Sequence, residues 1–455
     1  MSIDSFRRAM MLAASVTTFS LLFACGGGGG GGGGGSPQPS TWVGTKQLGA
    51  AGASTRAQAA AVDHNGNVYV VGYVDGALDG NTRSGDTDLF LTKYSSSGAR
   101  LFTRQLGVSG ADTQAQGVTV DSSNNVYVVG YTGGSLAGES RSGANDAFLI
   151  KYNSSGASQY TKLLGVSGAD TQAKAVAVDS SGNVFVVGYT TGALGISAPV
   201  GRRDVFVAKY TSSGTRLGIS QFGGSGGLVE GNSVALDSSG NAYVVGPTDV
   251  GVGGNSQTGS YDLFLVKLSG TTLDVVFTKQ MGSTSGQVVP EAVVLDSNGY
   301  INVAGITSGN FDGHTRIGSW DTFLIQFDSA GVRTAQSSQQ MGVSGFEARG
   351  AAIAADGNGN GNVYVAGYTT GGLDGNTLTG AWSDAFLTKF NSSYAKQFTR
   401  QLGPTGASAY GTGVAVNTSG DVFITGQTTG GLDGNTLTGA IDTFVTKYNS
   451  AGVKQ

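Results

Sequence analysis

The chain has 455 residues, a formal net charge of −4 and only 12% charged residues. It contains no basic patch and no arginine-rich stripe, so a nucleic-acid-binding function is not expected. After residue 40 no apolar pattern continues at helical spacing, and valine, threonine and aromatic residues are frequent, which indicates β-strands.

The first 25 residues have the pattern of a targeting segment. Arg7 and Arg8 precede an apolar stretch at 9–24, and the chain's single cysteine, Cys25, follows directly. This arrangement resembles a bacterial lipoprotein signal peptide (residues 1–25), which implies lipidation of Cys25, with palmitate among the acyl chains. The alternative is an ordinary secretory peptide with a stray cysteine. A single cysteine cannot form an intrachain disulfide, which favours the lipoprotein interpretation.

Residues 26–40 predict a flexible linker, because ten glycines and the string Ser-Pro-Gln-Pro-Ser cannot bury enough apolar surface to fold. We therefore expect an exported monomer held in the outer membrane, or at the cell surface, through its lipid anchor. Gly26 follows the cysteine where inner-membrane lipoproteins commonly have aspartate, which favours the outer membrane.

From residue 41 onward, one unit recurs seven times. Each copy contains an aspartate followed two residues later by phenylalanine, at Asp88, Asp146, Asp204, Asp262, Asp321, Asp384 and Asp442. The successive spacings are 58, 58, 58, 59, 63 and 58 residues. Self-similarity at this period is typical of propellers and solenoids.

Four short strands are predicted in each unit. In the second copy they span 115–121, 126–131, 146–152 and 159–164. The second and third are almost continuously apolar, which indicates that both of their faces are covered, as in a propeller blade. The sequence therefore predicts an all-β fold: a seven-bladed β-propeller of four-stranded antiparallel blades over residues 41–455.

The two ends of the repeat region complement each other. The last copy stops before its fourth strand, while Thr-Lys-Gln-Leu-Gly at 45–49 matches the fourth-strand string Thr-Arg-Gln-Leu-Gly at 103–107. We expect the N-terminal strand to complete the last blade and close the ring, because an incomplete blade would leave a bare edge.

The strings Val-Asp-Ser-Ser-Gly-Asn-Val-Phe-Val-Val-Gly-Tyr at 178–189 and Asp-Val-Phe-Val-Ala-Lys at 204–209 resemble the bacterial beta-propeller repeat family abbreviated SBBP. The hairpin is also similar to the NHL repeat. The resemblance covers residues 41–455 and implies a seven-bladed, commonly exported propeller with no single assigned activity. Gln326 departs from the usual lysine and Asn417 from the usual aspartate.

The loops between second and third strands are long, and three contain Leu-Asp-Gly-Asn-Thr, at 78–82, 373–377 and 432–436. Loops on a rigid scaffold often carry binding function, although aspartate, glycine and asparagine are also ordinary turn formers. The fifth copy has the most individual loop. We predict its residues Asp312, His314, Arg316 and Trp320 as a binding hot spot, since tryptophan and arginine are frequent binding anchors.

The seven recurring aspartates are interpreted as structural, because a catalytic site is needed once and not seven times. Each is expected to accept backbone N–H groups of the loop before its strand. Phe90 and its six counterparts are expected in the core between blades.

One stretch leaves calcium as a candidate, and no other cofactor is expected. Asp356, Asn358 and Asn360 match the first half of an oxygen-rich cation loop, but the closing carboxylate is missing because Gly367 stands in the twelfth position. Catalytic groups are scarce. His64 and His314 fall in turns expected on opposite faces, and the string Gly-Gly-Ser-Gly-Gly at 223–227 lacks the helix that follows a nucleophile elbow.

Three functions remain open on the sequence alone, one of which is a pure spacer or assembly module. The leading interpretation is a non-enzymatic envelope lipoprotein whose loop face binds a protein, a glycan or a matrix partner. The alternative is an exported carbohydrate-active enzyme, a lyase or hydrolase, acting at the mouth of the central channel.

Overall fold

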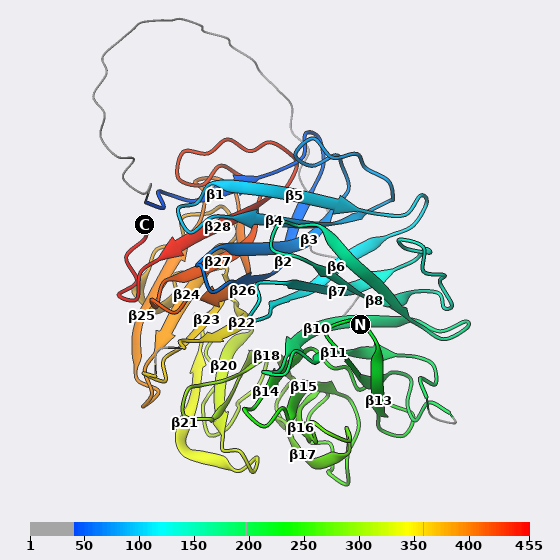
Figure 1. The fold of residues 1–455 in the computed structure, drawn as a ribbon. Coiled ribbons are helices and arrows are strands. Elements are labelled where there is room, and N and C mark those ends of the chain that lie inside the picture. The colour runs from blue at the N-terminus through cyan, green and yellow to red at the C-terminus, as the bar shows by residue number, and fades with distance from the viewer. Residues whose placement is uncertain (1–40, 196–197, 358) are drawn as a thin grey trace, which may run out of the picture. The chain divides into compact units, whose positions relative to one another are not determined.

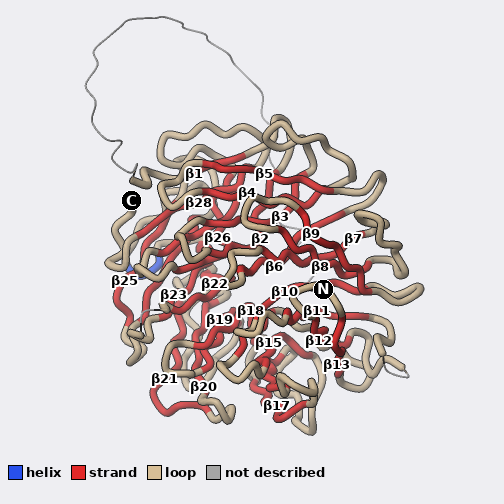
Figure 2. The backbone as a smooth tube through the Cα atoms, viewed as in Figure 1, coloured by secondary structure: helices blue, strands red, loops and turns tan. Residues whose placement is uncertain are grey.

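The repeated units fold as seven four-stranded antiparallel β-sheets, the blades of a propeller (Figures 1 and 2). The computed structural model describes residues 41–195, 198–357 and 359–455. The predicted fold class is therefore confirmed. Blades are numbered in chain order, so that blade one begins at residue 55.

Every blade uses the same strand order from the central channel outward. The innermost strands are β2 (Thr55–Val62), β6 (Thr113–Val120), β10 (Thr171–Val178), β14 (Ser233–Leu236), β18 (Val288–Leu295), β22 (Ala348–Ala355) and β26 (Ala409–Val416). The second strands are β3 (Val68–Val74), β7 (Val126–Thr132), β11 (Val184–Thr190), β15 (Ala242–Thr248), β19 (Ile301–Thr307), β23 (Val363–Thr369) and β27 (Val422–Thr428).

The third strands begin at the recurring aspartates: β4 (Asp88–Tyr94), β8 (Asp146–Tyr152), β12 (Asp204–Tyr210), β16 (Asp262–Leu268), β20 (Asp321–Phe327), β24 (Asp384–Phe390) and β28 (Asp442–Tyr448). The outer strands are β5 (Arg100–Leu106), β9 (Ser158–Leu164), β13 (Arg216–Phe222), β17 (Val275–Met281), β21 (Arg333–Met341), β25 (Lys396–Leu402) and β1 (Lys46–Leu48). One short 3₁₀ helix, η1 (Leu373–Gly375), lies in the long loop of blade six.

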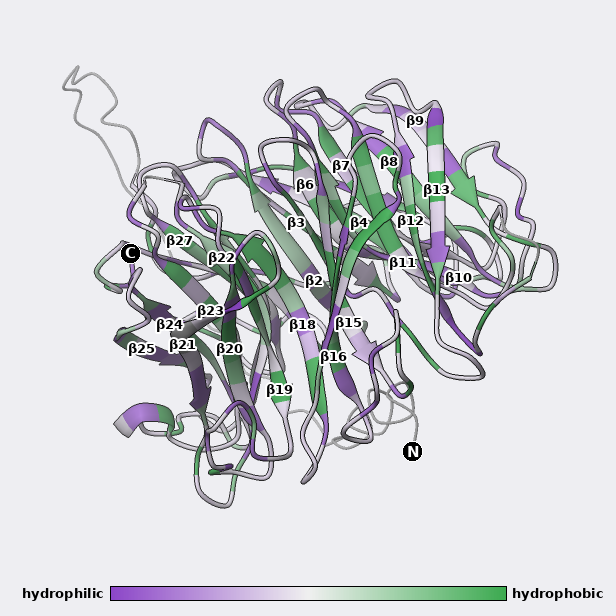
Figure 3. Ribbon diagram, turned by 90° about the horizontal axis from the view of Figure 1, so that it is seen from below, coloured by the Kyte–Doolittle hydropathy of each residue, from purple (hydrophilic) through white to green (hydrophobic). Residues whose placement is uncertain are grey.

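The core lies between neighbouring blades, and it explains the apolar runs in the second and third strands. All seven residues of β4 are buried, because each of its faces packs against another sheet. Phe90 is fully buried, and so are its counterparts in the other blades. In Figure 3 the hydrophobic colour follows the strands, while the hydrophilic colour is frequent in the loops.

The innermost strands begin earlier than predicted. In blade two, β6 starts at Thr113 and not at 115, since Thr113 and Gln114 already pair with Thr132 and Tyr131. A β-bulge follows between Ala115 and Gly117. The bulge interrupts the alternation of side chains, which hides the start of the strand in the sequence.

The recurring aspartates hold the long loops, as predicted. Asp88 is fully buried, and its carboxylate accepts the backbone N–H groups of Ser84 at 2.8 Å and Gly85 at 2.7 Å. Gln105 of the outer strand donates a third hydrogen bond at 2.8 Å. All seven aspartates accept two backbone N–H groups of the preceding loop in this way.

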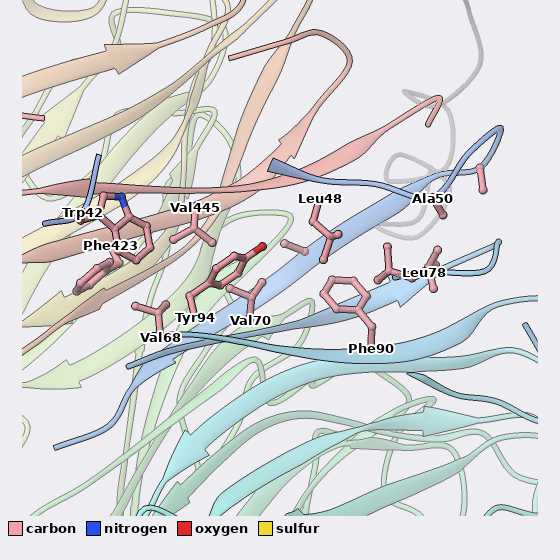
Figure 4. Close-up of a cluster of buried hydrophobic side chains, with 13 residues drawn as sticks. Trp42, Leu48, Ala50, Val68, Val70, Leu78, Phe90, Tyr94, Phe423 and Val445 are labelled. Carbon is pink, nitrogen blue, oxygen red and sulfur yellow. The ribbon is translucent and has the colours of Figure 1, made fainter. Parts of the chain in front are cut away.

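The N-terminal strand closes the ring. β1 pairs antiparallel with β28, and Gln47 stands opposite Phe444 in the register. In Figure 1 the blue β1 accordingly lies beside the red β28. Trp42, just before β1, is buried against Phe423 of blade seven and Tyr94 of blade one, with ring centroids 5.4 and 6.4 Å away (Figure 4).

Candidate functional site

The long-loop face is formed by the loops between second and third strands together with the loops that lead from one blade into the next. The two kinds of loop are hydrogen-bonded to each other. The N–H of Asp86 donates to the carbonyl oxygen of Ala111 at 3.0 Å, and the N–H of Thr113 donates to that of Thr87 at 2.9 Å. The remaining turns form the opposite, short-turn face, where His64 lies beside Asn124.

The Leu-Asp-Gly-Asn motif is a folding device. In blade one, Leu78 is fully buried, and Asp79 and Gly80 both have positive φ. The Asn81 side-chain amide donates to the carbonyl oxygens of Leu78 at 2.9 Å and Thr103 at 3.4 Å, which ties the loop to the outer strand. Blades six and seven repeat these contacts. The turn-former interpretation thus accounts for the motif.

The four predicted residues of blade five do not form one cluster. Asp312 is ion-paired with Arg333, and its side chain is only 3% exposed. Trp320 instead points toward the channel end of the blade, where Arg349 lies over its ring with a guanidinium-to-centroid distance of 4.4 Å. Arg316 is exposed, and its guanidinium donates to the carbonyl oxygen of Ser308 at 3.1 Å.

In blade five, His314 stands at the asparagine position of the Leu-Asp-Gly-Asn motif, and its contact with the outer strand differs from that of asparagine. Its Nε2 atom lies 3.1 Å from the hydroxyl of Ser338 on β21. In blade six the corresponding hydroxyl, that of Thr399, donates to Asp374 instead. One carboxylate oxygen of Asp312 is consequently buried without a hydrogen-bond partner among the described residues. His314 and Asp312 therefore lie against the outer strand and away from Trp320.

The most exposed large apolar residue that the structure describes is Trp382, with 76% of its surface accessible. It belongs to a one-residue insertion. In the other six blades the recurring aspartate binds the N–H groups of the residues three and four positions before it, whereas Asp384 binds those of Gly380 and Thr379, four and five positions before it. The insertion leaves the strand in register and adds a tryptophan to the long loop of blade six.

Two further apolar side chains are half exposed on loops of the same face: Ile317 at 49% and Phe346 at 48%. The loops that carry them are joined, because the N–H of Ser319 donates to the carbonyl oxygen of Phe346 at 2.8 Å. The Phe346 ring lies over Gly371, at the start of the blade-six loop. We call Ile317, Phe346 and Trp382 the apolar patch of blades five and six.

The innermost strands enclose a channel with a cavity of about 210 Å³. Its mouth on the long-loop face is rich in charged and aromatic groups that sequence reasoning missed. Glu230 is ion-paired with Arg203, and Arg349 with Glu347 at 2.9 Å. The Tyr189 hydroxyl donates to Asp170 at 3.0 Å, and burial, reinforced by the Asp170 charge, raises the pKa of Tyr189.

Variation among the repeats could have revealed this mouth. The position that is second in the innermost strand of six blades, and that precedes β14 in blade four, carries five different residue types, whereas the core positions hardly change. In chain order these residues are Arg56, Gln114, Gln172, Glu230, Val289, Arg349 and Tyr410. Where a position varies within an otherwise regular repeat, core packing does not dictate which residue type occupies it.

A larger cavity of about 650 Å³ opens on the short-turn face between blades four and five. Asp237, Asp296 and Asp328 line it, and each caps its own turn. Asp237, for example, accepts the N–H groups of Ser239 at 3.0 Å and Asn241 at 2.9 Å. These carboxylates are therefore already used by the fold.

The calcium candidate remains a prediction. Asp356 is buried and accepts the side-chain amide of Asn362 at 2.5 Å, the capping contact that Asp63 makes with Asn67 in blade one. Asn358 lies outside the described residues. Within the described part of the chain, no group of three or more histidine, cysteine, aspartate or glutamate side chains could hold a metal ion.

The Gly-Gly-Ser-Gly-Gly string at 223–227 is a loop between β13 and β14, and no helix follows it. Cys25, the predicted lipidation site, lies outside the described residues. No helix in the described part of the chain is long and apolar enough to span a membrane.

A family of propeller repeats matches five segments of this chain. The family model of the beta-propeller repeat, SBBP, matches residues 43–77, 101–137, 159–195, 218–252 and 397–433. A regulatory protein of Caulobacter vibrioides, FlaEY, is 26% identical over 426 residues, which are 82% of this chain and 42% of that protein. This chain thus spans less than half the length of that relative.

Several solved structures share low sequence identity with the chain. A streptogramin B lyase is 11% identical with a TM-score of 0.47, covering 88% of this chain and 96% of that one. A chain of the mitotic checkpoint complex is 12% identical with a TM-score of 0.48, covering 86% and 93%. The β-propeller domain of the Trilobed protease from Pyrococcus furiosus is 10% identical with a TM-score of 0.44, covering 89% and 97%. The match of the family model shows that SBBP beta-propeller repeats are present in this chain.

Proposed function

We propose that this protein is a non-enzymatic lipoprotein of the cell envelope whose long-loop face binds another protein through the apolar patch of blades five and six. The observation that supports this most is the inserted, 76% exposed Trp382. The fold does not require this residue, because the other six blades close the same loop without it.

The apolar character of the exposed residues on this face favours a protein partner over a glycan chain. Ile317 and Phe346 add aliphatic and aromatic surface that offers no hydrogen bonds, and tryptophan is enriched among the residues that dominate protein interfaces. Arg316 supplies a charged group at the rim of the patch. The relative in Caulobacter is named a regulatory protein, a role compatible with binding.

The proposed location rests on Cys25. Acyl chains on this cysteine would hold the propeller at the outer membrane, since each buried methylene contributes about 0.8 kcal/mol. The Cys25→Ser variant should move from the membrane fraction to the soluble fraction. Unchanged membrane association of this variant would contradict a lipid anchor at Cys25.

The binding surface can be tested by deleting Trp382, which restores the loop length of the other blades. The deletion and Phe346→Ala should each lower the partner retained from envelope extract by about tenfold or more, as expected for a hot spot. Tyr300→Ala is the matched control, because Tyr300 is 39% exposed on the short-turn face. Loss of the partner with Tyr300→Ala, and its retention without Trp382, would show that the working face is the other one.

A further inference from the structure

The innermost strands share a bulge that directs one extra side chain into the channel. In blade one the register shifts between Ala57 and Ala59, so that Gln58 has no opposite residue on β3. The same shift recurs in blades two, three, five, six and seven, and in blade four β14 begins directly after the equivalent Asn232. We call these residues the bulge ring: Gln58, Gln116, Lys174, Asn232, Glu291, Ala351 and Thr412.

All members of the bulge ring except Glu291 line the cavity. Some already bind the backbone of a neighbouring blade. The Asn232 amide donates to the carbonyl oxygen of Pro290 at 3.0 Å, and the Thr412 hydroxyl donates to that of Ala57 at 3.0 Å. These two contacts join adjacent blades, so they explain two polar members of the ring structurally.

The polar side chains of blades one and two do not make such contacts with a neighbouring blade. Among the described residues, the side chains of Gln58, Gln116 and Arg56 make no hydrogen bond or ion pair. Arg56 lies two residues before Gln58 on β2, toward the long-loop mouth, and is half-buried like Gln58, which lines the cavity. Lys174 of blade three is the next member of the ring, and its ammonium lies 5.5 Å from the Tyr189 ring centroid.

This side of the channel therefore offers hydrogen-bond donors and the cationic side chains of Arg56 and Lys174. The ring's carboxylate, Glu291, belongs to blade five, across the channel. A guanidinium binds a carboxylate through two parallel hydrogen bonds, and the glutamine amides both donate to and accept from hydroxyl groups. The arrangement suits a ligand with one acidic group and several hydroxyls.

The remaining wall supplies small residues and an aromatic surface. Blades six and seven contribute Ala351 and Gly413 to the lining of the cavity. Tyr410 is at the same strand position as Arg56 in the adjacent blade, and its ring packs edge-on against Tyr368 with centroids 5.0 Å apart. A cavity of about 210 Å³ is smaller than the ~300 Å³ lower bound of drug-sized sites, so it admits a single sugar unit and not a chain.

We propose that the long-loop end of the channel binds a sugar acid of monosaccharide size, with Arg56 holding its carboxylate and Gln58 and Gln116 holding its hydroxyls. This site is separate from the apolar patch and does not depend on it.

Calorimetric titration of the full chain with sodium glucuronate tests the site, with glucose and inorganic phosphate as comparisons. Glucuronate should bind about tenfold or more tightly than either, because only it presents a carboxylate and hydroxyls together. Arg56→Ala should reduce the affinity for glucuronate to that for glucose, since a charge-assisted hydrogen bond is lost. Arg100→Ala, on the outer strand of the same blade, is the control and should bind like the unaltered chain.

Three results would each overturn the proposal. They are equal affinities for glucuronate and glucose, tighter binding of phosphate than of glucuronate, and an Arg56→Ala variant that binds glucuronate and melts like the unaltered chain. Gln116→Ala provides a second variant should Arg56→Ala fail to fold, and it should weaken glucuronate and glucose alike. Deletion of Trp382 should leave glucuronate binding unchanged, so the failure of this site and the failure of the protein-binding patch are distinguishable.

Discussion

At the scale of single residues, the repeat is held by a matched pair of aspartate and glycine. The buried Asp88 carboxylate occupies the space beside Gly107, where an added Cβ would lie 1.7 Å from its Oδ1 atom. The same approach occurs in all seven blades. The role of the aspartate could be predicted from its sevenfold recurrence. That of the glycine could not, because it depends on a distance between two strands.

Gly107→Ala should lower the free energy of unfolding by about 1–3 kcal/mol, as overpacking of a core does. Asp88→Ala should also destabilise the fold, because the buried N–H groups of Ser84 and Gly85 lose their acceptor. In the double variant the alanine methyl group enters the space of the carboxylate, so the two losses should not add. Urea unfolding of the unaltered chain, the two single variants and the double variant measures these free energies. Gly107→Ala combined with Asp86→Ala, at an exposed residue, is the control, and there the losses of unfolding free energy should add. Additive losses for Gly107→Ala and Asp88→Ala would contradict this packing.

A second residue-scale feature joins blades five and six. Asn302 replaces the aromatic residue of the other second strands, and Gln326 replaces the lysine opposite it. Tyr394 of blade six, at a turn position that is glycine in five other blades, fills this space, and its hydroxyl donates to Asn302. Burial, with the nearby Asp296 charge, raises the pKa of Tyr394 well above its usual range, so the hydroxyl stays protonated.

Tyr394→Gly should therefore destabilise the protein although it restores the residue of the other blades. The lost aromatic packing costs about 3–5 kcal/mol, and relief of the positive φ of 61° returns only about 1–2 kcal/mol. Thermal melting measures the difference. An unchanged or higher melting temperature would show that the tyrosine is not needed to fill blade five.

At the scale of elements, the predicted strand inventory and ring closure agree with the structure, because both rest on repetition that the sequence displays directly. The bulges and the channel mouth were missed, since a bulge is defined by pairing and the mouth residues belong to seven separate strands. The long loops were correctly located. Their Leu-Asp-Gly-Asn motif, however, fixes the loop against the outer strand, which leaves only a few exposed side chains for recognition.

Deleting residues 41–49 should open the ring. Blade seven would lose its outer strand, and the buried Trp42 would leave the core between blades one and seven. We expect a clear fall in melting temperature and association through the bare edge of β28, measured by calorimetry and light scattering. Deleting residues 26–35 is the control and should leave the melting temperature unchanged. Equal effects of the two deletions would contradict closure by β1.

The same closure is sensitive to acid. Burial alone would raise the pKa of the Asp433 carboxyl, but hydrogen bonds from Lys454 and Thr45, together with the Lys454 charge, lower it below its usual range. A depressed pKa adds stability above the ordinary carboxyl value, and this stability is lost as the pH falls toward the folded-state pKa. Asp433→Asn should therefore reduce stability at pH 7 and narrow the difference in stability between pH 7 and pH 3. An unchanged difference in urea unfolding would contradict the role of this carboxylate.

At the scale of the whole molecule, the propeller is a regular scaffold with a small number of departures. Six of the long loops keep one spacing to the recurring aspartate, and only blade six inserts a residue. The predicted hot spot in blade five lies beside this insertion in the ring, but its residues are largely engaged by the fold. The hot spot in blade five stays a prediction, and the inserted, exposed Trp382 of blade six was not among its residues, because exposure depends on how neighbouring loops pack.

Site-specific photo-crosslinking in cells tests the binding face most directly. A photoreactive amino acid at position 382 is on the long-loop face, and the same amino acid at position 300 is on the short-turn face. We predict that position 382 crosslinks to one protein partner and that position 300 does not. A crosslinked partner at position 300, with none at position 382, would contradict the central claim that the long-loop face of blades five and six is the binding surface.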